Sequence, residues 1–172
     1  MKQFAFSLLQ VCLFRKKPQD LPASRTLLIY SASAAFIIFF FRNTLLSGSG
    51  NSFPIALVQV ILLGISLKAL LILFSKHERW LQSATALFGC SALLVAAVIP
   101  FLIAAGSGDF ANDSLSAAKL VVMFASIWYF AIIIFILRET LEVSLILGFV
   151  LALVMELMLA SVILKMFGDS LL

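Results

Sequence analysis

Two charged residues lie inside hydrophobic runs, and they are the positions in this sequence most suited to chemistry. Glu156 stands near the middle of the last run, and Lys68 stands within the second. Charged groups are costly in a bilayer, so such residues often serve ion or proton pathways or pair with a charged partner helix. We expect Glu156 to be protonated or paired, because a bare carboxylate is poorly solvated there.

A pair between Lys68 and Glu156 is one hypothesis, but their depths differ. At 1.5 Å per residue, Lys68 lies about 10 Å from the inner boundary and Glu156 about 20 Å. Glu139 and Glu142, nearer that boundary, are alternative partners for Lys68. Either Lys68 extends to the inner headgroups and Glu156 is a protonated packing residue, which we favour, or both line an ion or proton path.

Small residues recur at steps of four in the same hydrophobic runs. Membrane helices approach one another closely along such stripes, so Glu156 is expected to face protein rather than lipid. The helix-packing candidates are Ser144, Gly148, Ala152 and Ala160 in the last run, Gly64 in the second and Gly89 in the third.

No catalytic or metal-binding motif is present in the sequence. It contains no HExxH, GxSxG, P-loop or paired intramembrane aspartates. Cys12, Cys90 and His77 do not have the spacing of metal ligands. We therefore predict no enzyme activity, no catalytic residue, no metal and no cofactor. The basic residues form no aromatic-rich patch, so no nucleic-acid partner is expected.

The composition requires an apolar solvent for most of the chain. Of 172 residues, 63% are hydrophobic and only 12% are charged, whereas soluble domains average about 25% charged residues. A soluble domain of this size has too little interior to bury so much apolar surface. The predicted fold class is an all-α polytopic membrane helix bundle.

Five hydrophobic runs are long enough to cross a bilayer, which takes about 17–25 residues. Arg42 lies near the end of the first run and is expected to extend to the far interface. Trp128 and Tyr129 are expected to pack, and Gln59 to form a hydrogen bond between helices. The predicted spans are residues 26–46, 54–75, 81–105, 118–137 and 141–166.

The distribution of basic residues predicts the orientation, because loops on the cytoplasmic side are richer in Lys and Arg. An inward N-terminus places eight basic residues on the cytoplasmic side and three outside, with the C-terminus on the periplasmic side. The eight are Lys2, Arg15, Lys16, Lys17, Arg25, Lys76, Arg79 and Arg138.

Residues 1–25 are predicted to form a cytoplasmic-side amphipathic segment followed by a proline-containing link. Phe4, Leu8, Val11 and Cys12 share one helical face, which suits the inner headgroup layer. Arg15, Lys16 and Lys17 follow, as candidates for contact with anionic lipid. A docking helix for a partner protein is the alternative.

The five-span plan with a cytosolic N-terminus and short loops resembles the Yip1 family. Residues 13–24 (LFRKKPQDLPAS) and 79–89 (RWLQSATALFG) resemble stretches of small proteobacterial inner-membrane proteins. The resemblance implies the fold and an inner-membrane location. Eukaryotic Yip1-like proteins act in membrane traffic with Rab GTPases, but this sequence lacks their long cytosolic N-terminal region, so that role is not implied.

Three functional hypotheses follow. The first is a non-catalytic membrane scaffold or accessory subunit that binds other membrane helices, either of another protein or of its own copies. The second is a small transporter or channel component with a polar path using Glu156 and Lys68. The third is a lipid-responsive anchor that acts through residues 1–17.

Overall fold

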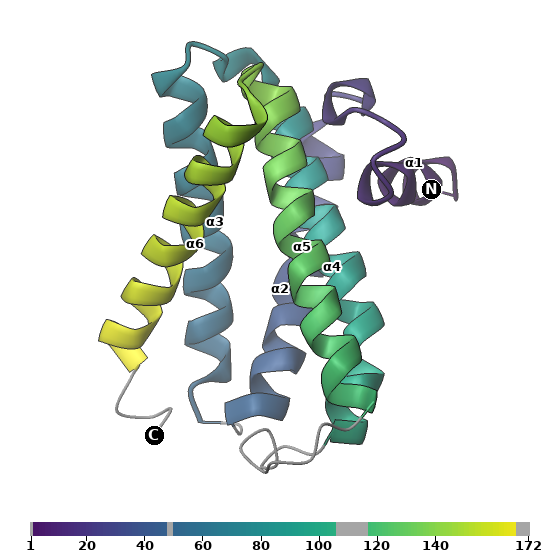
Figure 1. Ribbon diagram of the computed structural model, residues 1–172, viewed down its shortest axis with the longest axis vertical. Helices are drawn as coiled ribbons and strands as arrows, with labels where there is room; N and C mark the ends of the chain where they lie inside the picture. The colour runs from purple at the N-terminus through teal and green to yellow at the C-terminus, as the bar shows by residue number, and fades with distance from the viewer. Residues whose placement is uncertain (1, 48–49, 106–116, 168–172) are drawn as a thin grey trace.

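The computed structural model describes residues 2–47, 50–105 and 117–167, and over those ranges the chain is all-α (Figure 1). The prediction of an all-α helix bundle is confirmed. The α-helices are α1 (Lys2–Cys12), α2 (Arg25–Ser47), α3 (Ser52–Leu73), α4 (Trp80–Ala105), α5 (Ala117–Leu141) and α6 (Leu145–Phe167), with the 3-10 turns η1 (Pro18–Asp20) and η2 (His77–Arg79).

Helices α2 to α6 are each long and apolar enough to cross a membrane. Their bounds agree with the predicted spans to within about two residues, except at one junction. Helix α5 continues to Leu141, so Arg138 lies in its last turn, and α6 begins only at Leu145. The break falls at Glu142, whose φ is 56°, and Ser144 Oγ then accepts a hydrogen bond from Leu147 N at 3.3 Å.

The five long helices form a ring in the order α2, α3, α6, α5, α4, with each helix in contact with the next and α4 in contact with α2. Helix α4 is the most enclosed of the five, and every residue from 83 to 90 is buried. It is covered by α2, α5 and α1. Figure 1 shows α3 and α6 on one side of the ring and α2, α4 and α5 on the other.

Polar contacts gather at one end of the ring, here called the paired end and comprising residues 17–24, 74–79 and 138–144. Lys17 Nζ lies 3.0 Å from Glu139 Oε2. Glu142 pairs with Lys76 and, at 2.6 Å, with Arg79. These contacts join three separate chain segments, so the paired end fixes the relative positions of the helices that leave it.

Helix α1 lies crosswise against the side of the bundle rather than beyond its end (Figure 1). Leu8, Val11 and Cys12 are buried. Trp128 Nε1 on α5 donates to Cys12 O at 3.2 Å, and the Phe14 ring packs against Trp128 and Phe135. The face expected to lie in lipid is therefore occupied by α4 and α5. The opposite face of α1 carries the exposed Phe6 and Leu9, and Leu13, just beyond the helix, is exposed as well.

Candidate functional site

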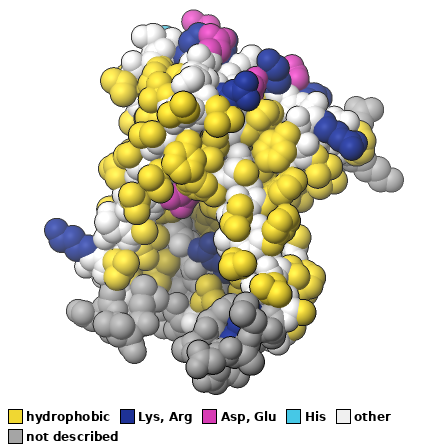
Figure 2. All heavy atoms as spheres, viewed as in Figure 1, with side chains coloured by type: hydrophobic (Ala, Val, Ile, Leu, Met, Phe, Trp, Pro, Cys, Tyr) yellow, Lys and Arg dark blue, Asp and Glu magenta, His cyan; other side chains and the backbone are white. Residues whose placement is uncertain are grey.

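The helix ring forms a partly open cavity of about 200 Å³, and the polar part of its lining comes from four helices. Arg42 reaches it from α2, Gln59 from α3, Tyr129 from α5 and Glu156 from α6. Apolar side chains complete the lining of this polar cavity, namely Phe39, Leu63, Leu159, Ala160 and Ile163. Figure 2 shows an acidic and a basic side chain in the hollow middle of this face, between hydrophobic surfaces.

Arg42 is held in place by hydrogen bonds to two amide side chains. Its Nη2 donates to Gln59 Oε1 at 3.0 Å and to Asn43 Oδ1 at 3.1 Å. Asn43 Nδ2 also donates to Gln59 Oε1, at 3.2 Å. The guanidinium carbon lies 5.1 Å from the centre of the Phe39 ring, a cation–π distance. Together these contacts fix a permanent positive charge inside the bundle.

Glu156 faces this charge from α6 and keeps one oxygen free. Its Oε1 is buried and has no hydrogen-bond partner among the described residues. The Arg42 guanidinium interacts electrostatically with Glu156 and also with Tyr129. Buried polar atoms are nearly always hydrogen-bonded, so an unpartnered carboxyl oxygen on a cavity wall marks a position that can accept a proton, an ion or a solute group.

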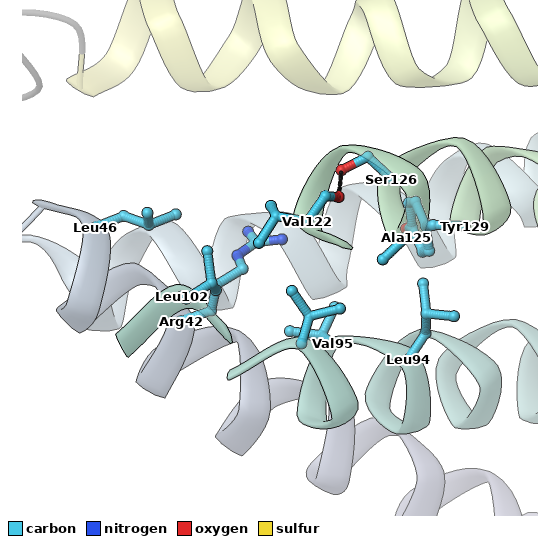
Figure 3. Close-up of a pocket in the computed structure, with 10 residues that line it drawn as sticks. Arg42, Leu46, Leu94, Val95, Leu102, Val122, Ala125, Ser126 and Tyr129 are labelled. Atoms are coloured by element: carbon cyan, nitrogen blue, oxygen red, sulfur yellow. Dashed lines mark hydrogen bonds between the residues drawn. The ribbon is translucent and has the colours of Figure 1, made fainter. Parts of the chain in front are cut away.

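A second, more apolar cavity of about 250 Å³ adjoins the first. Arg42 and Tyr129 line both, so the two cavities meet at these side chains. Figure 3 shows the Arg42 side chain extending toward Val122 of α5, with Leu94 and Val95 of α4 on another side of the same cavity. The hydroxyl of Ser126 is already used, since it donates to Val122 O at 2.9 Å.

Lys68 and Glu156 do not line the same cavity. Lys68 is exposed and lines a different groove, formed by α2, α3 and α4. The alternative partners are engaged as well, because Glu139 pairs with Lys17 and Glu142 pairs with Lys76 and Arg79. The hypothesis of a shared path is corrected in this respect: the positive charge near Glu156 is that of Arg42.

Sequence reasoning missed Arg42, Asn43 and Tyr129 as members of the site. Arg42 was expected to extend to the far interface, but α2 continues to Ser47, so Arg42 lies more than one turn inside the helix. The signal available in advance was Gln59, a polar residue within an apolar helix that needed a partner. Its expected bond between helices is present, with Arg42 as one donor.

The small-residue positions differ in what they contact. A methyl group on Gly148 would lie 3.4 Å from Arg138 Cβ and 3.5 Å from Ile134 O, so α6 approaches α5 closely there. Ala152 is fully buried. Ser144 and Ala160 are exposed at the ends of the same stripe, with Ala160 on the rim of the polar cavity.

The two remaining helix-packing candidates, Gly64 and Gly89, each lie against a large side chain of a neighbouring helix. A methyl group on Gly64 would lie 3.4 Å from the tip of Phe88, and one on Gly89 would lie 2.8 Å from both methyl groups of Leu8. Gly64 therefore permits the approach of α3 to α4. Gly89 permits the docking of α1 on α4, a role that its sequence position alone did not reveal.

The basic residues proposed for lipid contact have different surroundings. Lys17 pairs with Glu139 at 3.0 Å. Lys16 Nζ donates to Ser7 Oγ at 3.2 Å. Arg15 is exposed in the turn that follows α1. Lys17 thus belongs to the paired end, while Arg15 faces outward.

The carboxyl group of Glu142, which lies between α5 and α6, has a strongly lowered pKa. Hydrogen bonds from Lys76 and Arg79, with the positive charges of both, lower its pKa from an ordinary value of 4.5 to about 2. Its carboxylate is therefore ionised at any physiological pH, and it acts as a structural anchor rather than a proton carrier.

Over the described residues, no group of three His, Cys, Asp or Glu side chains is arranged to hold a metal ion. Comparisons with protein-family models, curated proteins and solved structures find no match.

Proposed function

We propose that this chain is a small membrane transport component in which Glu156 binds and releases a proton inside the polar cavity. Its unpartnered Oε1 is the observation that carries the proposal. No covalent chemistry is involved. In the transport hypothesis drawn from the sequence, Lys68 was the basic residue of the polar path. In this proposal, Arg42 is the basic residue beside Glu156.

The fixed guanidinium gives Glu156 two distinct electrostatic states. When the carboxylate is ionised, its charge compensates that of Arg42, with which it interacts. When Glu156 is protonated, the charge of Arg42 is left uncompensated in a medium of low dielectric constant. A proton arriving at Glu156 therefore changes the electrostatics of the whole cavity, which is what a coupling or permeation step requires.

The experiment is a proton-flux measurement on purified protein in sealed vesicles. A pH-sensitive dye is enclosed, and a membrane potential is imposed with potassium and valinomycin. We expect the parent protein to raise proton entry above that of protein-free vesicles. Glu156→Gln, which keeps the shape of the side chain but cannot ionise, should return entry to the protein-free level.

The matched control is Glu78→Gln, which makes the same chemical change at an exposed position in η2, outside the cavity. Its flux should equal that of the parent. Thermal unfolding of all three proteins tests whether Glu156→Gln is folded. Equal flux in the parent, in Glu156→Gln and in protein-free vesicles would overturn the proposal.

A membrane scaffold or accessory subunit is the second candidate function, with copies of the chain or another membrane protein as partner. Its sequence argument is weakened because Gly148 and Ala152, expected on a partner-binding stripe, already pack within the chain. The native mass of the particle in a mild detergent separates the two candidates. A second protein in fixed stoichiometry would favour the accessory role.

We infer a location in a bacterial inner membrane, with the paired end cytoplasmic and the C-terminus periplasmic. What supports this is the distribution of charge: Lys17, Lys76, Arg79 and Arg138 all belong to the paired end. Basic residues are retained preferentially on the cytoplasmic side. The lipid-contact role suggested for Arg15 and Lys16 is consistent with this orientation.

A further inference from the structure

A groove of about 300 Å³ on the outside of the ring is lined by Lys68, a charged residue of a spanning helix that does not line the polar cavity. It runs between α2, α3 and α4, away from Glu156. Lys68 lines it, and the other lining residues are almost entirely apolar: Leu28, Ile29, Ala32, Val60, Ile61, Gly64, Ile65, Trp80 and Phe88.

The polar and apolar parts of this groove are separated along α3. Lys68 lies five residues from Leu73, the end of α3 that meets the paired end, and Trp80 begins α4 at the same end. Val60 lies eight residues from Lys68, which is about 12 Å along the helix. The groove is therefore cationic near the interface and apolar toward mid-membrane, as an amphiphile with an anionic head requires.

Lys68 is available for such a ligand. Its residue is exposed, and none of the ion pairs found among the described residues involves it. Gly64 leaves the floor of the groove open, since a side chain there would meet the ring of Phe88. Trp80 at the rim has the amphipathic ring typical of membrane interfaces.

We propose that this groove binds one phospholipid with an anionic headgroup, its phosphate at Lys68 and an acyl chain over Gly64 toward Val60. An anionic headgroup matches the charge of Lys68, and an acyl chain matches the apolar remainder of the lining, so one molecule of phospholipid satisfies both parts of the groove. The site is independent of proton binding at Glu156.

The test is native mass spectrometry of protein equilibrated with phosphatidylglycerol or phosphatidylcholine. The parent should retain one phosphatidylglycerol in preference to phosphatidylcholine. Lys68→Gln should lower that preference about fivefold, the contribution typical of one basic residue near an anionic lipid. Lys165→Gln removes an exposed lysine from α6, outside the groove, and should leave the preference unchanged.

A second variant probes the apolar part of the groove. Gly64→Leu fills the floor and should reduce retention of both lipids while Lys68 remains. If Gly64→Leu fails to fold, Lys68→Gln still tests the lipid site. Lys68 is exposed, so its substitution is expected to leave the fold intact. Equal phosphatidylglycerol preference in the parent, Lys68→Gln and Lys165→Gln would overturn the proposal.

Discussion

At the scale of single residues, several charged side chains fall into three places: a polar cavity, the outer groove at Lys68 and a surface network. Glu156 and Arg42 share the cavity, Lys68 lines the groove, and Glu142 joins two turns at the paired end. Their positions inside hydrophobic runs of the sequence identify Glu156 and Lys68 as unusual. These positions do not predict which residue each one contacts, because contacts depend on the rotation and order of the helices.

Glu142 makes stability depend on pH. Its folded-state pKa of about 2 lies below its ordinary value of 4.5, so its ionised form favours the folded state. That contribution is present above the ordinary pKa and is lost as the pH falls toward 2. We expect the melting temperature of the parent to exceed that of Glu142→Gln at pH 7, and the difference to shrink between pH 5 and pH 2.

Thermal unfolding in detergent micelles at several pH values measures this difference. Glu78→Gln is the control at the same end of the bundle, since no ion pair found among the described residues involves Glu78. It should lower the melting temperature at pH 7 less than Glu142→Gln does. A constant gap between the parent and Glu142→Gln from pH 7 to pH 2 would contradict the anchoring role.

At the scale of elements, helix α1 was predicted in the right place in the chain but with its apolar face toward lipid. A face of Phe4, Leu8, Val11 and Cys12 is equally suited to lipid or to protein, because both are apolar. The deciding feature is Gly89 on α4, which leaves room for Leu8. Nothing in the sequence links two positions eighty residues apart.

The docking of α1 can be tested at Gly89. Gly89→Val should displace α1, because even the Cβ of the new side chain would lie 2.8 Å from the Leu8 methyl groups, and its two methyl groups would need further space. Overpacking costs about 1–3 kcal/mol, and 1.4 kcal/mol corresponds to a tenfold change in an equilibrium. We expect alkylation of the buried Cys12 and Cys90 to become at least about fivefold faster, measured with a membrane-permeant maleimide.

The control is Ala97→Val on the exposed side of α4, which should leave both cysteines protected. If Gly89→Val protects Cys12 and Cys90 as well as the parent does, α1 does not depend on this contact. The outcome reports on α1 alone, because Gly89 lines neither the polar cavity nor the groove at Lys68.

At the scale of the whole molecule, hydrophobic length was sufficient to predict five spans, since each must be long enough to cross a bilayer. The prediction ended the fourth span at residue 137, whereas α5 continues to Leu141. The difference arises because Arg138 interrupts the hydrophobic run one turn before the helix ends. The ring order of the helices was beyond prediction. It depends on close approaches such as Gly148 to α5, and small residues indicate an approach without naming the partner.

The orientation gives a whole-molecule prediction. Glu78→Cys, in η2, should react with a membrane-impermeant maleimide only from the cytoplasmic side, and Asn51→Cys only from the opposite side. Both positions are exposed, whereas the native Cys12 and Cys90 are buried and react slowly. Labelling of sealed right-side-out and inverted vesicles measures this. The reverse pattern, or labelling of both positions from one side, would refute the assigned orientation.

The crosswise position of α1 has a consequence for the shape of the protein. Leu8 docks at Gly89, nine residues from the start of α4, or about 13 Å along that helix. If the five long helices span a bilayer, α1 adds a sixth helix in the half nearer the paired end. We therefore expect each copy to displace more lipid area from that leaflet than from the other, and to collect where the membrane curves so that this leaflet is convex.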